Sequence, residues 1–143
     1  GAGTKIGPFA HLRPGNQLGE RVKIGNFVEV KNSHMGDDAK ASHLAYVGDA
    51  VLGKRVNVSC GVIFANYDGK DKYKSVVEDD GFIGSNVNIV SPVHVGKKAF
   101  LAAGSTITKD VEADSLAIER SEQISVSNWS QKKTKKAKKM EEE

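Results

Sequence analysis

Histidine and tyrosine stand three residues apart in the stretch AKASHLAYVGDAVLG, residues 39–53. Imidazole has an ordinary pKa nearer neutrality than any other side chain, so His43 is the best candidate for proton transfer. Tyr46 adds a hydroxyl that can donate or accept a hydrogen bond. The stretch therefore predicts a general base at His43, with a structural histidine on a strand face as the alternative.

Metal and triad chemistry are less well supported. The spacings of His11, His34, His43 and His94 place no two of them on neighbouring turns of the repeat described below. The only cysteine is Cys60, and no G-x-S-x-G nucleophile motif is present. We therefore expect no bound metal.

The bulk composition predicts one domain with a thin aliphatic core. The chain has 143 residues, of which 38% are hydrophobic but only 6% aromatic, and it contains 15 glycines. A single cysteine excludes an internal disulfide and favours a cytoplasmic location. No long apolar run and no signal-peptide pattern occur, so we expect no membrane partner.

The net charge of +3 arises in one segment. Residues 131–143 hold six lysines and three glutamates, a balance of 6 − 3 = +3, while the remaining residues hold 15 basic and 15 acidic side chains. A nucleic-acid-binding domain usually carries its basic face on the folded part. The charge pattern therefore argues against nucleic acid and predicts a disordered tail over 131–143.

Aliphatic residues recur at every sixth position over most of the chain, with an occasional step of five. The series is Ile6, Leu12, Leu18, Ile24, Val30, Met35, Ala41, Val47, Leu52, Val58, Phe64, Val77, Ile83, Ile89, Val95, Leu101 and Ile107. Mostly small residues follow four places later, as at Ala10, Val22, Val28, Ala39, Val56, Val87, Val93, Ala99 and Ser105. A period of six fits a β-solenoid in which three hexapeptides form one triangular coil.

The repeat defines the expected organisation. We predict an all-β solenoid over 1–110, with a protruding loop at about 65–76, a closing segment over 111–130 and the charged tail over 131–143. Glycine often follows the aliphatic residue, and we expect it there because a corner needs backbone angles that a Cβ opposes. The first coil would be an open edge, so we also expect an upstream domain or a partner to cover it.

Several longer blocks resemble one enzyme family. They are IGNFVEVKN, SHLAYVGDA, VNVSCGVIFANYDGKDKYKS, FIGSNVNIVSPV and AAGSTITKDV with LAIER. Together they resemble, over residues 1 to about 125, the glucosamine-1-phosphate acetyltransferase domain of the bacterial bifunctional enzyme that makes UDP-N-acetylglucosamine for cell-wall synthesis. The resemblance implies a left-handed parallel β-helix, a homotrimer with sites between subunits, acetyl-CoA as cosubstrate and glucosamine 1-phosphate as acceptor. It also implies that the uridyltransferase half is absent from this chain.

The resemblance also implies roles for individual residues. His43 is the proton acceptor, and Asn66 orients the amine. The positions that hold the sugar phosphate are Arg13, Lys31, Tyr46, Asn57 and Lys72. The positions on the acetyl-CoA side are Cys60, Asn66, Tyr67, Ser85, Ala103 and Arg120.

Two positions differ from the family's usual pattern. Cys60 stands where a smaller residue is usual, and Ser42 stands where glycine is frequent. A free thiol at position 60 would change how a thioester is held and would be open to oxidation. Two other readings remain open: a hexapeptide acyltransferase with a different acceptor, and a non-catalytic trimeric β-helix scaffold.

Overall fold

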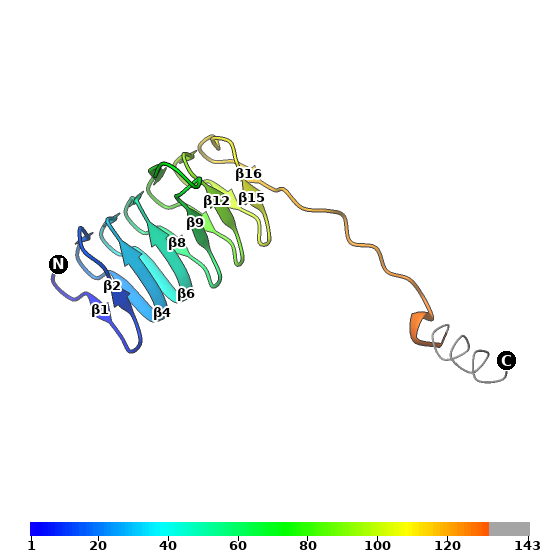
Figure 1. Cartoon of the computed structure of the whole chain (residues 1–143), viewed down its shortest axis with the longest axis horizontal. Coiled ribbons are helices and arrows are strands. Elements are labelled where there is room, and N and C mark those ends of the chain that lie inside the picture. The colour runs from blue at the N-terminus through cyan, green and yellow to red at the C-terminus, as the bar shows by residue number, and fades with distance from the viewer. Residues whose placement is uncertain (132–143) are drawn as a thin grey trace.

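A computed structural model describes residues 1–131, in which the chain forms a left-handed parallel β-helix from Lys5 to Ala117 (Figure 1). Each strand pairs in parallel with strands of the neighbouring coils, on both sides within the solenoid and on one side at its ends. The predicted all-β solenoid is therefore confirmed. The predicted tail over 131–143 lies outside the described residues, apart from Gln131.

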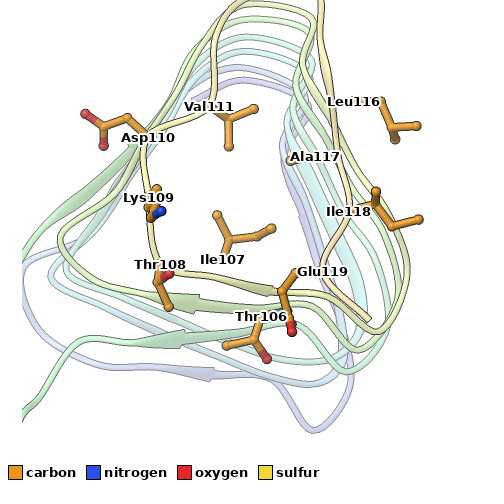
Figure 2. A pocket seen from close by; sticks show the side chains of 10 residues that line it. All are labelled: Thr106, Ile107, Thr108, Lys109, Asp110, Val111, Leu116, Ala117, Ile118 and Glu119. Atoms are coloured by element: carbon orange, nitrogen blue, oxygen red, sulfur yellow. The ribbon is translucent and has the colours of Figure 1, made fainter. Parts of the chain in front are cut away.

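The strands form three walls, which close a triangular coil in the end-on view of Figure 2. The first wall contains β1 (Lys5–Ile6), β8 (Asn57–Val58), β11 (Phe82–Ile83), β14 (Phe100–Leu101) and β16 (Leu116–Ala117). The second contains β2 (His11–Leu12), β9 (Ile63–Ala65), β12 (Asn88–Val90) and β15 (Thr106–Ile107). The third contains β3 (Gln17–Leu18), β5 (His34–Met35), β7 (Ala50–Leu52), β10 (Ser75–Val77) and β13 (His94–Val95). The long strands β4 (Lys23–Lys31) and β6 (Lys40–Gly48) run through the first two walls.

The pairing register explains the irregular steps of the repeat. Ile6 pairs with Ile24 after 24 − 6 = 18 residues, which is three hexapeptides. Ile24 pairs with Ala41 after 41 − 24 = 17 residues, because a corner that needs one residue fewer still keeps the side chains in phase. Val58 pairs with Ile83 after 83 − 58 = 25 residues, because this coil carries the inserted loop.

The core is the axial stack of repeat residues. Every aliphatic of the series from Ile24 to Ile107 is buried, and so are the predicted small residues from Val22 to Ser105. Ile6 and Leu12 are 48% and 38% exposed, because only one neighbouring coil covers them. Burial of such small side chains in a continuous column supplies most of the hydrophobic stabilisation.

The reason we expected for the glycines after the aliphatic residues is wrong. Positive φ angles occur two positions further on, for example at Arg21 and Asp38, and not at Gly19 or Gly36. A Cβ at Gly36 would instead lie 2.7 Å from the carbonyl carbon of Gly53 in the next coil. Several of these glycines, such as Gly36, are needed because backbone packs directly on backbone between coils, whereas nothing lies within 4 Å of a Cβ at Gly7.

The inserted loop and the closing segment both differ slightly from their predicted bounds. The loop spans residues 66–74, since β9 ends at Ala65 and β10 begins at Ser75. The closing segment begins as part of the coil, because β16 pairs with β14 and Val111 bridges to Val95. Ile107 and Val111 point into the prism at this end, whereas Leu116 points outward (Figure 2). After β16 the chain leaves the coil as an extended segment (Figure 1).

Candidate active site

Asp49 is the centre of a polar cluster at the corner between the second and third walls. We call this the loop corner; it comprises Asn32, Asp49 and the loop 66–74. The Asp49 carboxylate accepts hydrogen bonds from Asn32 (Nδ2 to Oδ1, 2.6 Å) and Asn66 (Nδ2 to Oδ2, 2.6 Å). Lys31 Nζ lies 3.7 Å from Oδ2. The cluster therefore joins residues from three successive coils.

Backbone geometry places these side chains. Asn32 and Asp49 have φ angles of 45° and 49°, a region that Asn and Asp enter more easily than most residues. The N–H of Asp49 donates to the Lys31 carbonyl at 3.0 Å, and the N–H of Asn32 donates to the Pro14 carbonyl at 3.0 Å. Successive turns are thereby stacked, and their side chains meet at one edge.

The loop 66–74 folds back on itself and brings Lys72 to this cluster. The Asp68 carboxylate accepts from the backbone N–H groups of Lys70 and Asp71 at 2.8 and 2.7 Å and from the Tyr73 hydroxyl at 3.0 Å. Tyr67 and Lys72 form an antiparallel bridge. The loop is thus internally braced, and Asn66 at its start is 7% exposed while Lys72 reaches solvent.

Three cations lie near Asp49, which is the one buried carboxylate within residues 1–131. Arg13 follows β2, Lys31 ends β4 and Lys72 lies in the loop, and the pairing of Leu12 with Val30 places Arg13 beside Lys31 on successive coils. The neighbouring Lys31 ammonium lowers the pKa of Lys72, and the more distant Arg13 acts in the same direction. Asp49 opposes both. Such an excess of positive charge favours a bound anion.

The ionisation of Asp49 is set by opposing effects. Burial by itself raises the pKa of this carboxyl group, but the amides of Asn32 and Asn66 and the charges of Lys31 and Lys72 together lower it below its ordinary value. The carboxylate is therefore charged at neutral pH. Sequence reasoning missed it, although an Asp within the apolar stretch YVGDAVL was a visible signal.

Strand β6 connects this cluster to the candidate base. Asn66 Nδ2 lies 3.3 Å from the Tyr46 hydroxyl, and His43 lies three residues before Tyr46 in the same strand, which turns a corner at Leu44 (φ 34°). The His43 ring is exposed and, within residues 1–131, has no hydrogen-bonded partner. His43, Tyr46 and the cations thus share the second wall or its edges.

Three of the predicted acetyl-CoA residues, Cys60, Ser85 and Ala103, follow a second edge, between the first and second walls. We call it the histidine corner, and it comprises His43, Cys60, Ser85 and Ala103. Each stands two positions after one of the stacked residues Ala41, Val58, Ile83 and Leu101. The carbonyls of Cys60 and Ser85 accept from the backbone N–H groups of Asn86 and Gly104 at 2.9 and 2.8 Å. These four residues form one exposed ladder that begins at the candidate base.

Arg120 extends the ladder, since its Nη1 donates to the Ala103 carbonyl at 2.7 Å. Three predicted residues are not brought to the groups assigned to them. Asn66, assigned to acetyl-CoA as well as to the amine, lies at the loop corner against Asp49. Asn57 lies on the first wall, where it bonds the Ser59 hydroxyl at 3.0 Å, away from the loop corner. Tyr67 is exposed in the loop and hydrogen-bonds the Gly69 carbonyl at 2.7 Å, away from the histidine corner.

An open apolar groove of about 450 Å³ separates the two corners. Its lining residues are Phe27, Glu29, Leu44, Ala45, Tyr46, Gly61, Ile63 and Asn86. In the part of the chain that the structure describes, no group of three or more His, Cys, Asp or Glu side chains could hold a metal ion. No helix among the described residues is long and apolar enough to cross a membrane.

Solved structures share this fold. The acetyltransferase domain of PglB from Neisseria gonorrhoeae FA1090, solved in complex with acetyl coenzyme A, superposes with a TM-score of 0.69 at 20% identity. The superposition covers 77% of this chain and 51% of that one. At this identity the similarity establishes the parallel β-helix fold that the two share. No family model matches the sequence.

Sequence relatives are far more similar. The bifunctional protein GlmU of Clostridioides difficile (strain 630) is 55% identical over 136 residues, which are 95% of this chain and 30% of the relative. GlmU of Caldicellulosiruptor saccharolyticus is 56% identical over 126 residues, 88% of this chain and 27% of the relative. The resemblance drawn from the sequence motifs is therefore confirmed. The chain spans less than a third of the length of these relatives.

Proposed function

We propose that the protein transfers an acetyl group from acetyl-CoA to the 2-amino group of glucosamine 1-phosphate, giving N-acetylglucosamine 1-phosphate. The observation that carries this proposal is the convergence of Arg13, Lys31 and Lys72 around Asp49, beside Tyr46 and Asn66. A sugar phosphate needs cations and hydrogen-bond donors from several directions. The similarity to GlmU over nearly the whole chain supports the same assignment. The cytoplasmic location predicted from the sequence belongs to this proposal.

The mechanism uses His43 as general base. The amine nitrogen attacks the thioester carbonyl carbon and forms the new C–N bond while His43 accepts a proton from the nitrogen. The C–S bond then breaks, its electron pair leaves with sulfur, and the thiolate takes up a proton to give free CoA. The phosphate clamp and Asn66 fix the direction of attack.

A backbone donor is available for the charge that develops on the carbonyl oxygen. The N–H of Gly61 is engaged with the Leu44 carbonyl at 2.6 Å, whereas the N–H of Cys60 has no partner within residues 1–131. Cys60 stands next to His43 on the histidine corner. We assign this N–H as the donor that stabilises the tetrahedral intermediate.

The proposal includes a homotrimer. Phe9 and Phe27 stack with centroids 5.6 Å apart at the histidine corner, where Phe9, Phe27 and Leu44 are 75%, 62% and 58% exposed. Exposed apolar ladders of this kind favour a subunit interface. A neighbouring subunit is also the route by which Asn57, on the first wall, would reach an acceptor site. Light scattering after size exclusion should give the mass of three 15.3 kDa chains.

The direct test is formation of the acetylated sugar. The whole chain should convert acetyl-CoA and glucosamine 1-phosphate to N-acetylglucosamine 1-phosphate, detected by mass spectrometry. Detection of product is preferable to a thiol reagent, because the exposed Cys60 would react with the reagent. Absence of product would overturn the proposal.

The two alternatives give different results in the same experiment. A hexapeptide acyltransferase with another acceptor would acetylate a different amine or hydroxyl in a panel of acceptors. A scaffold would show no thermal shift with acetyl-CoA. The anion-binding cluster at the loop corner is what favours the sugar phosphate over both.

A further inference from the structure

We propose that Asp49 is the positioning residue of the acceptor site, holding Asn66 and Lys31 in the arrangement that receives the amine and the phosphate. The inference deepens the proposed function and rests on it. Asp49 would act through these neighbours rather than by touching the reacting atoms.

The two oxygens of Asp49 have separate partners. Oδ1 accepts from Asn32 Nδ2 at 2.6 Å, and Oδ2 accepts from Asn66 Nδ2 at 2.6 Å with Lys31 Nζ at 3.7 Å. Asp49 is 7% exposed, and its side chain is 10% exposed. A carboxylate this buried is tolerated only when its oxygens are satisfied. Removing its charge would therefore release the groups that it holds.

The fold does not itself need a carboxylate at this position. The same corner is occupied one coil earlier by Asn32 and two coils earlier by Gly15, with φ angles of 45° and 87°. Each satisfies the requirement for a left-handed backbone. The negative charge at Asp49 must therefore serve its side-chain partners rather than the turn.

Asp49 also compensates the charges around Lys72. Lys31 and Arg13 lower the pKa of Lys72, and Asp49 raises it. Without the carboxylate, Lys72 would lose its proton at a lower pH and would stop binding phosphate there. The alkaline limit of acceptor binding should therefore move to lower pH.

The test compares steady-state kinetics of the whole chain and its Asp49→Asn variant. Asn has nearly the shape of Asp and tolerates the same φ angle. The variant should raise the KM for glucosamine 1-phosphate about 10-fold or more, since a charge-assisted contact is lost. The KM for acetyl-CoA should stay unchanged, and the alkaline rise of the acceptor KM should begin at lower pH.

Asp38→Asn is the matched control. Asp38 also has a positive φ angle (59°) and an ion pair, to Arg21, but lies at a different corner. Its kinetics should equal those of the unmodified chain. If Asp49→Asn does not fold, Asn32→Gly removes the donor to Oδ1 while keeping a turn that Gly15 already makes, and it should raise the acceptor KM in the same direction.

Each outcome decides the question. An unchanged KM for glucosamine 1-phosphate and an unchanged pH profile in Asp49→Asn would overturn the role of Asp49. An equal rise in KM for both substrates, together with a lower melting temperature, would also overturn it, because the residue would then be merely structural. An unmodified chain that makes no product refutes the proposed function, and this inference with it. Normal activity of the unmodified chain with normal Asp49→Asn kinetics refutes the inference alone.

Discussion

His43 is exposed, and its contribution to the fold is through its backbone, which pairs with Asn26 in strand β4. Replacing it with alanine should therefore remove chemistry and leave structure intact. We expect His43→Ala to lower kcat by roughly 10² to 10⁴, the usual contribution of a general base. The melting temperature and the acetyl-CoA thermal shift should stay near those of the unmodified chain.

His34 provides the control for that substitution. It is also an exposed histidine on a strand, β5, but it lies on the third wall beside Asn32 of the loop corner and away from the histidine corner, where the proton transfer is assigned. His34→Ala should leave kcat unchanged. Equal turnover in the His43→Ala and unmodified proteins would remove His43 from the mechanism.

Arg13 is expected to contribute to substrate binding rather than to proton transfer. Its Nη1 lies 3.3 Å from Glu29 Oε1, and its side chain is 43% exposed, so it is available to a ligand. Arg13→Ala should mainly raise the KM for glucosamine 1-phosphate, with a smaller effect on kcat, because phosphate binding is common to the ground state and the transition state. A fall in kcat with an unchanged KM would contradict this role.

Some residues of the candidate site could be predicted from the sequence, and Asp49 could not. Motif position alone located Arg13, Lys31 and Lys72, which the structure brings to one corner. Asp49 was missed because a lone Asp after Gly resembles an ordinary surface turn. Its burial arises from neighbours 17 residues away on either side, Asn32 and Asn66, and that geometry depends on the exact coil length.

Within a single coil, the turns were only partly predictable. The period of six predicted the strands correctly, and it predicted the buried series from Ile24 to Ile107, because side-chain phase is a property of sequence. The bounds of the loop and the role of the glycines could not be predicted in this way, because both depend on how closely the next coil approaches. Contacts between coils are absent from any local pattern.

Gly36 and Gly7 test that explanation of the glycines. Both follow an aliphatic residue, but a Cβ at Gly36 would lie 2.7 to 2.9 Å from the backbone of Gly53 and Lys54, whereas nothing lies within 4 Å of a Cβ at Gly7. Gly36→Ala should lower the free energy of unfolding by about 1 to 3 kcal/mol, the usual cost of overpacking. Gly7→Ala should change it by less than about 0.5 kcal/mol. Urea unfolding measures both, and equal stability of the two variants would contradict direct backbone packing.

Over the whole solenoid, the corner between the third and first walls carries an alternating ladder of charge. We call it the charged corner, and its residues in successive coils are Arg21, Asp38, Arg55, Asp80, Lys98 and Asp114. Arg21 Nε lies 2.8 Å from Asp38 Oδ1, and Arg55 Nη2 lies 2.8 Å from Asp80 Oδ2. If a coil stacked one position out of order, two residues of like charge would become neighbours along this corner. The ladder therefore favours the native stacking order.

The ladder also makes stability depend on pH. The hydrogen bond from Arg21 lowers the pKa of Asp38, and that from Arg55 lowers the pKa of Asp80. A carboxyl group with a lowered pKa in the folded state stabilises that state above its unfolded pKa, about 3.9 for Asp. This stabilisation is lost as the pH falls through the folded-state value, because the unfolded chain then binds more protons than the folded chain.

The Arg55→Gln variant tests the contribution of the Arg55–Asp80 pair to this pH dependence. Without the guanidinium, the pKa of Asp80 should return toward its ordinary value, so the variant should lose less stability than the unmodified chain between pH 5 and pH 3, about the range in which Asp titrates. The urea midpoint, measured at several pH values, should show the two proteins converging as the pH falls. High salt should reduce their difference at neutral pH, because exposed pairs are screened. A constant difference at every pH would mean that Arg55 acts by packing along the corner rather than through Asp80.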